Sequence, residues 1–203
     1  MPACDISRQT SKNLQAVSQT EQWFEHVVLG LNLCPFAHAP AKAKRVRFVP
    51  LLMSDLSDCE SDLLILMTEE IERLLNTPVE QLETTLIVAP EGFEDFYRYN
   101  QTLGYLEHWL VAQGWEGFVQ IASFHPDYQF AGSTPEDAQN LTNRSPYPIF
   151  HLIREASLSA IIDNGADTDA IPARNIARVS ALTQAERRLL FPYLYTESAP
   201  ENR

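Results

Sequence analysis

The sequence predicts a single α/β domain, in which a small, mostly parallel sheet with a βαβαβ core is flanked by helices and followed by a helical C-terminal part. Apolar runs of strand length alternate with helix-period stripes up to residue 124, as in parallel strands joined by helical crossovers. A length of 203 residues, with 45% hydrophobic and 21% charged side chains, fits one folded domain. We place this domain at 16–195, between a disordered N-terminal tail at 1–15 and a flexible C-terminal tail at 196–203.

Charge and composition argue against several classes of function. A formal net charge of -12 disfavours binding to nucleic acid or to an anionic membrane, since both need a basic face. The sequence begins without a basic and then apolar leader, and no apolar run approaches the roughly 18 residues of a membrane span, so we expect a cytoplasmic protein. Three cysteines without CxxC spacing, Cys4, Cys34 and Cys59, predict reduced thiols rather than disulfides or a zinc site.

The first elements follow from periodicity and from the residues that end helices. Apolar residues over 23–31 form one helical stripe, and the helix ends before Pro35 because proline disfavours helical geometry in the residue that precedes it. Alternation over 45–49 predicts a short strand with one face in solvent. The capping-box spacing of Ser57 and Glu60, followed by a leucine-rich stripe, predicts the second helix.

The middle of the chain predicts a buried strand, a helix and a third strand. The apolar run at 84–89 lacks alternation, which indicates a strand buried on both faces at the centre of the sheet. A helical stripe at 96–110 ends before Gly114, a residue type that readily closes helices. The next strand, at 118–124, leads directly to His125.

The remaining chain predicts a long loop and then helices. The loop at 126–144 is rich in turn-forming residues, and its length indicates a functional segment. Ser145 and the proline after it provide a cap and a first-turn residue for a helix at 146–162. Two closing helices are predicted at 169–182 and 184–191.

Side chains that ionise or form specific hydrogen bonds are concentrated at 123–155, and we therefore expect the functional site there. Ligands of open α/β sheets bind beyond the carboxyl ends of the strands, and His125 follows one such end. Histidine titrates near neutral pH, so His125 is the candidate general acid or base. Asp127 or Glu155 would orient its ring.

Two arginines predict a small anionic substrate. On a helix at 146–162, His151, Arg154 and Glu155 share one face, which begins just after Arg144. Guanidinium groups beside the backbone N–H groups of a helix N-terminus suit a carboxylate or a phosphate. The further substrate-binding candidates are Asn143, Tyr128 and His151.

Each assignment has a plainer alternative. The polar face could be a solvated helix surface, and His125 could be a core histidine bonded to the backbone. A metal site is not favoured, because the five histidines lack HxH, HxxH and HExxH spacing and a site would need His125, His151, Asp127 and Glu155 to converge. No nucleotide-binding motif is present, so the sequence names no cofactor. Cys34 could be a nucleophile, but the negative end of the preceding helix opposes thiolate formation, which favours a small core residue.

Five blocks of the sequence are long and distinctive: LGLNLCPFA at 29–37, ETTLIVAP at 83–90, SFHPDYQFAG at 123–132, TNRSPYPIFHLIREAS at 142–157 and IPARNIARV at 171–179. They resemble, in the expected order, the hallmark blocks of a bacterial family, domain of unknown function 1415. The resemblance covers roughly 20–182 and implies a single cytoplasmic domain. It carries over no catalytic or binding residues, so every role above rests on side-chain chemistry.

Two hypotheses of function follow. The first is an enzyme, such as a hydrolase or transferase, that acts on a small carboxylate or phosphate by general acid/base chemistry. The alternative is a non-catalytic module that binds a metabolite or a partner protein through the same arginines and aromatic residues. A buried acid/base pair in one cleft with the arginines would favour the enzyme. A thiol redox protein centred on Cys34 is a third hypothesis.

Overall fold

Four strands form one mixed sheet at the centre of the protein. The computed structural model describes residues 3–53, 59–163 and 168–195. The strands are β1 (Val46–Pro50), β2 (Thr84–Val88), β3 (Val119–Phe124) and β4 (Ile149–Arg154), in the spatial order β1-β2-β4-β3. β1 and β2 are parallel, whereas β4 is antiparallel to both of its neighbours. The α/β class is confirmed, but the sheet is mixed rather than mostly parallel, and the expected βαβαβ core is not confirmed.

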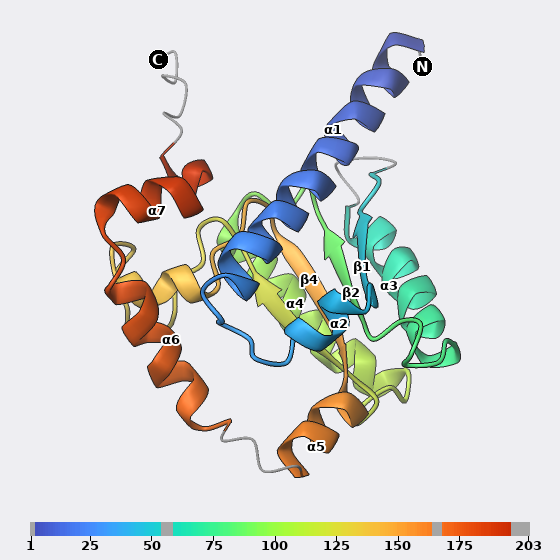
Figure 1. The fold of residues 1–203 in the computed structure, drawn as a ribbon. Coiled ribbons are helices and arrows are strands. Elements are labelled where there is room, and N and C mark those ends of the chain that lie inside the picture. Colours follow the sequence, from blue (N-terminus) through green and yellow to red (C-terminus); the bar gives the residue numbers. More distant parts are fainter. Residues whose placement is uncertain (1–2, 54–58, 164–167, 196–203) are drawn as a thin grey trace.

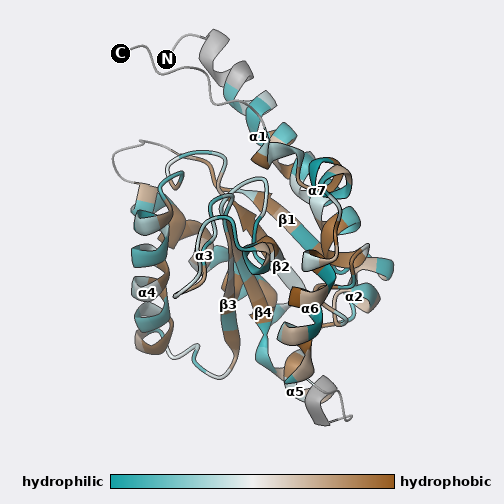
Figure 2. Ribbon diagram, turned by 90° about the vertical axis from the view of Figure 1, so that its left-hand side faces the viewer, coloured by the Kyte–Doolittle hydropathy of each residue, from teal (hydrophilic) through white to brown (hydrophobic). Residues whose placement is uncertain are grey.

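Helices lie on both faces of this sheet. Figure 2 shows α3 and α4 on one side of the strands and α1, α2, α6 and α7 on the other, so the molecule has three layers. In Figure 1, α1 crosses in front of the sheet. The helices are α1 (Ala3–Trp23), the π-helical turn η1 (Phe24–Leu29), α2 (His38–Lys42), α3 (Cys59–Asn76), α4 (Phe96–Ala112), the 3-10 helix η3 (Ala138–Thr142), α5 (Glu155–Asp163), α6 (Ala170–Ser180), α7 (Gln184–Leu190) and the 3-10 helix η4 (Pro192–Leu194).

Two apolar clusters hold the layers together. Because successive side chains of a strand point to opposite faces, neighbouring residues of one strand belong to different clusters. Ile87 and Phe150 face α3 and α4, while Leu86 and Ile149 face α1 and η1. All five residues of β2 are buried, as the sequence predicts for a central strand.

Strand β4 occupies part of the region where the sequence predicts a helix at 146–162. The run IFHLI is apolar and rich in β-formers, and Pro148 pushes the residue before it towards extended geometry. β4 bonds to β2 on one side and to β3 on the other, which satisfies its backbone along its whole length. The helix prediction is therefore wrong for 149–154 and holds only for α5.

The N-terminal segment also differs from the prediction of a tail at 1–15. Helix α1 begins at Ala3, and Asn13, Ala16 and Thr20 are buried on its inner face. The Thr20 hydroxyl donates to the Ala16 carbonyl at 2.8 Å. The expected C-terminal tail at 196–203 lies outside the described residues, as does the expected cap Ser57.

Several helix boundaries agree with the sequence prediction. Asp95 caps α4 by accepting a hydrogen bond from the backbone N–H of Arg98. Gly114, just past the end of α4, has a φ of 74°, which suits glycine best. Thr183 and Glu186 form the predicted capping box at the start of α7.

Strand direction decides where the predicted site residues lie. β3 is antiparallel to β4, and β4 is antiparallel to β2, so β3 runs in the same direction as β1 and β2. His125 follows the carboxyl end of β3, at one edge of the sheet. Arg154 ends β4 and Glu155 begins α5, at the opposite edge. These groups therefore do not share a cleft.

Candidate functional site

His125 is a fully enclosed residue of the core. Its exposed fraction is 0%, and its ring lies against Phe96 and Tyr99, with centroids 5.1 Å away in each case. Nδ1 accepts a hydrogen bond from the backbone N–H of Asp127 at 3.0 Å, so Nε2 carries the proton that it donates to the Phe93 carbonyl at 2.9 Å. Burial lowers the pKa of His125, which keeps the ring neutral. Both nitrogens are occupied, as in the alternative of a core histidine.

The loop that follows His125 is ordered by hydrogen bonds among its own residues. Asp127 is exposed, and its backbone rather than its carboxylate contacts His125. Asn143 donates to the Ser123 carbonyl at 3.1 Å. Arg144 donates to the Tyr128 carbonyl at 3.3 Å and to the Pro135 carbonyl at 2.8 Å. Arg144 therefore closes the loop.

Arg154 closes the end of helix α3. Its guanidinium donates to the carbonyls of Leu74, of Thr77 at 2.6 Å and of Leu82 at 3.1 Å. The last carbonyls of a helix have no partner inside the helix, and a cation there is favourable. Arg144 and Arg154 therefore both bind backbone carbonyls. Neither guanidinium group is free to anchor an anion, contrary to the expectation from the sequence.

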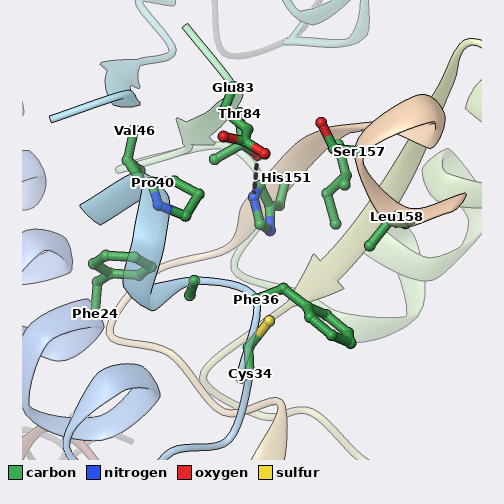
Figure 3. A pocket seen from close by; sticks show the side chains of 12 residues that line it. Phe24, Cys34, Phe36, Pro40, Val46, Glu83, Thr84, His151, Ser157 and Leu158 are labelled. Atoms are coloured by element: carbon green, nitrogen blue, oxygen red, sulfur yellow. Dashed lines mark hydrogen bonds between the residues drawn. The ribbon is translucent and has the colours of Figure 1, made fainter. Parts of the chain in front are cut away.

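A cavity that contains His151 lies on the other face of the sheet, where α2, η1 and α5 meet the strands. Its volume is about 70 Å³. Figure 3 shows the side chains that line it. We call it the His151 pocket. Its walls are Phe24, Cys34, Phe36, Ala37, Pro40, Val46, Glu83, Thr84, His151, Ile153, Ser157 and Leu158.

Thr84 determines which nitrogen of His151 carries the proton. The Thr84 hydroxyl has one hydrogen, which it donates to the Leu152 carbonyl at 2.6 Å. Thr84 Oγ1 can therefore only accept from His151 Nε2, also at 2.6 Å. In the neutral ring, Nδ1 is then the acceptor, and among the described residues no hydrogen bond to this nitrogen is found. Figure 3 shows the ring extending into the pocket from its bond to Thr84.

His151 is neutral at physiological pH. Burial lowers its pKa to about 4, because the charged ring would lose its hydration. The side chain retains some accessible surface, and it lines the pocket. The ring thus offers an unprotonated nitrogen to a molecule bound there.

Glu83 is the second ionisable wall residue. Its Oε2 lies 2.9 Å from Nη1 of Arg45, which makes an ion pair, and Nη1 also donates to the Val79 carbonyl at 3.1 Å. Oε2 is buried, and the ion pair lacks the alignment of a good hydrogen bond. Because an ionised carboxylate can accept several hydrogen bonds, Glu83 keeps acceptor capacity beyond this pair.

Cys34 stands between the π-helical turn η1 and the short helix α2. Burial raises the pKa of its thiol, while the backbone N–H groups of Phe36 and Ala37 act in the opposite direction. The thiol is therefore protonated at neutral pH, which argues against a nucleophilic role in the unliganded protein. π-Helical turns often occur at functional sites, and η1 brings Phe24 to the same pocket.

A second, larger cavity adjoins the first. Its volume is about 520 Å³, and Cys34 lines both cavities. It lies between α6 and the loop before β4, with Asn143, Phe130 and Asn175 among its walls. The Asn175 side chain donates to the Leu33 carbonyl at 2.7 Å, which ties α6 to the segment that carries Cys34.

The structure brings together residues that the sequence did not link. Of the eight predicted site residues, His151 alone lines the His151 pocket. Glu83, Thr84 and Ser157 are not among the residues that the sequence singles out as a site. Only the pairing of β2 with β4 places Thr84 beside His151, and their separation in sequence conceals it.

The described part of the chain shows neither a metal-binding group of side chains nor a membrane-spanning helix. No three His, Cys, Asp or Glu side chains are grouped there so as to hold a metal ion. None of the helices in these ranges is both long and apolar enough to cross a membrane.

Comparison with known proteins gives one match. A family model described as protein of unknown function (DUF1415) matches residues 15–188. No curated protein and no solved structure matches the chain.

Proposed function

The chain belongs to the family described as protein of unknown function (DUF1415), and we propose that it is an enzyme in which His151 accepts a proton from a small organic substrate held in the His151 pocket. General acid/base chemistry is retained from the sequence-based hypothesis. The base moves from His125 to His151, because both nitrogens of His125 are bonded to the backbone.

One observation carries this proposal: His151 Nδ1 is an unprotonated acceptor within a cavity. A general base needs a free lone pair within reach of the substrate and must be unprotonated at working pH. Thr84 supplies the orientation, since its bond to Nε2 keeps the ring in the tautomer with Nδ1 free. Thr84 also accepts a stronger hydrogen bond when the ring becomes charged, which stabilises the protonated base.

The test compares turnover by the natural protein and by the His151→Gln variant. Each is incubated with a small-molecule cell extract, and the compounds consumed and formed are followed by mass spectrometry. We expect at least one conversion that needs His151. His108→Gln is the matched control, because His108 is exposed and its hydrogen bond within the described part of the chain is to the Gly104 carbonyl of its own helix. Equal conversion by both proteins would contradict the assignment of His151.

Non-catalytic binding of a metabolite is the second candidate. The pKa of His151, lowered to about 4, favours this alternative. A base with so low a pKa has little driving force to remove a proton from a substrate at neutral pH. The mostly apolar walls also suit simple binding. A ligand that stabilises the protein against heat and is recovered unchanged in every assay would support this alternative.

A further inference from the structure

The polar atoms of the His151 pocket that can take a further hydrogen bond are mainly acceptors. His151 Nδ1 presents a lone pair, and the Glu83 carboxylate has two oxygens that can only accept. Glu83 Oε2 is buried in an ion pair with Arg45, and among the described residues no well-aligned hydrogen bond to this oxygen is found. A buried polar group without a partner destabilises a folded protein, so an occupant that donates to these atoms would be favoured.

Among the described residues, no cationic side chain lines the pocket to bind an anionic ligand. Arg45 is not a wall residue, and its charge is directed to Glu83. Arg154 is held by the carbonyls after α3. The other polar wall groups are the Cys34 thiol, a weak donor, and the Ser157 hydroxyl, which can donate or accept. A carboxylate in this cavity would face the Glu83 carboxylate, whose cationic partner Arg45 lies outside the walls.

Size and lining restrict the rest of the ligand. One water molecule needs roughly 10–15 Å³ of cavity volume. The His151 pocket, at about 70 Å³, therefore holds a molecule of roughly five non-hydrogen atoms. Most of the walls are apolar, which favours a ligand whose remaining atoms are hydrocarbon. The apolar wall residues include Phe24, Phe36, Val46, Ile153 and Leu158.

We propose that the His151 pocket binds a small molecule with a hydrogen-bond-donating head group, a hydroxyl or an amine, on a branched hydrocarbon body, and that the head group lies between His151 and Glu83. This assignment rests on the proposed function in taking the same pocket as the working site, but it requires no turnover. Glu83 is then the residue that selects donors over carboxylates.

Saturation-transfer NMR with three compounds of one carbon skeleton tests the assignment at neutral pH. We expect isobutanol or isobutylamine to receive saturation from the protein, and isobutyrate to receive none. Stronger transfer to the amine would mean that Glu83 acts as a counter-ion, and stronger transfer to the alcohol would mean that Arg45 already neutralises it. Either result supports the proposal. Binding of isobutyrate as strong as that of the donors, or binding of none of the three, would overturn it.

A variant then links the selectivity to Glu83. Glu83→Gln keeps the size of the side chain but replaces one acceptor with a donor, and it should weaken donor binding by about tenfold or more. Glu80→Gln is the matched control, since Glu80 is exposed and does not line the pocket. A folded Glu83→Gln protein, checked by thermal unfolding, with unchanged donor binding would overturn the role of Glu83. If the extract assay finds no turnover that depends on His151, the proposed enzyme function fails, but the NMR binding results still stand. The two proposals can therefore fail independently.

Discussion

At the scale of single residues, His125 and His151 show how the same side chain can be hydrogen-bonded in different ways. The two nitrogens of His125 meet one backbone donor and one backbone acceptor, and the ring is closed off from solvent. Among the described residues, the ring of His151 has one hydrogen-bond partner, Thr84, and no hydrogen bond to its second nitrogen is found. Sequence placed both among the candidate residues, but the distinction depends on partners from distant strands and loops.

Replacing His125 by Ala should lower the free energy of unfolding by about 2–5 kcal/mol. The change leaves a cavity and removes partners from the Phe93 carbonyl and the Asp127 N–H. Urea unfolding measures the loss. Replacement of the exposed His108 by Ala is the control, for which we expect a change within about 0.5 kcal/mol. A stable His125→Ala protein would show that His125 is not a core residue.

The pKa of His151 predicts how stability depends on pH. It falls from an ordinary value of 6.5 to about 4 on folding, so between these values the unfolded chain binds more protons than the folded one. Stability therefore decreases as pH falls from 6.5 towards 4, by up to about 3 kcal/mol from this residue.

Urea unfolding at pH 7 and at pH 4.5 checks this direction. His151→Gln should lose less stability than the natural protein over that interval, because glutamine does not titrate, whereas His108→Gln should behave as the natural protein does. An equal loss in all three would mean that acid weakens the fold through other groups.

The density of polar groups at 123–155 is a poor guide to a site at this scale. Several of those groups bind backbone carbonyls or N–H groups. Buried polar atoms must find partners, so a dense polar loop often satisfies itself. Glu83 precedes β2 and Thr84 begins it, and nothing in this mostly apolar run indicates a site.

At the scale of elements, Arg154 links the end of β4 to the end of α3. Replacing it by Met keeps the apolar part of the side chain but leaves the carbonyls of Leu74, Thr77 and Leu82 without their donor. We expect a loss of about 1–3 kcal/mol in the free energy of unfolding, with faster hydrogen exchange in the last turn of α3.

Arg174→Met is the control for this prediction, since Arg174 is exposed on α6. Stability equal to that of the natural protein would mean that water replaces the guanidinium at these carbonyls without cost.

Elements with local signals were predicted well. The capping box of Thr183 and Glu186 involves neighbours in sequence, and it is present in the structure. The apolar stripe of α3 and the unbroken apolar run of β2 also need no distant partner. The segment 149–154 was misassigned because an apparent cap at Ser145 outweighed an apolar run, and the run forms a strand only when β2 and β3 are beside it.

At the scale of the whole molecule, β4 joins the two parts of the sheet. Phe150 is fully buried against Phe93 and Tyr99, with ring centroids 5.3 and 4.9 Å away. Phe150→Ala should lower the free energy of unfolding by about 3–5 kcal/mol. The amides of β2, β3 and β4 should lose hydrogen-exchange protection together, because their pairing is continuous.

Phe118→Ala is the control, since Phe118 is 59% exposed just before β3. If β3 alone lost protection in the Phe150 variant, the sheet would consist of two independent units instead of one.

The overall arrangement could be predicted only in part. Alternation of strands and helices up to β3 correctly indicates that β1, β2 and β3 share one direction. Sequence order does not show that a later strand enters between β2 and β3. That arrangement depends on which strand edges remain open when β4 pairs, and no local pattern records it.

The position of β4 also has a consequence for synthesis of the protein on the ribosome. A nascent chain that ends before residue 149 contains β2 and β3 but lacks the strand that separates them in the finished sheet. Direct parallel pairing of β2 with β3, the arrangement that sequence order suggests, is then open to it. Such an intermediate would have to open again before β4 enters, so we expect slow folding, helped by any factor that shields the two strand edges until translation is complete.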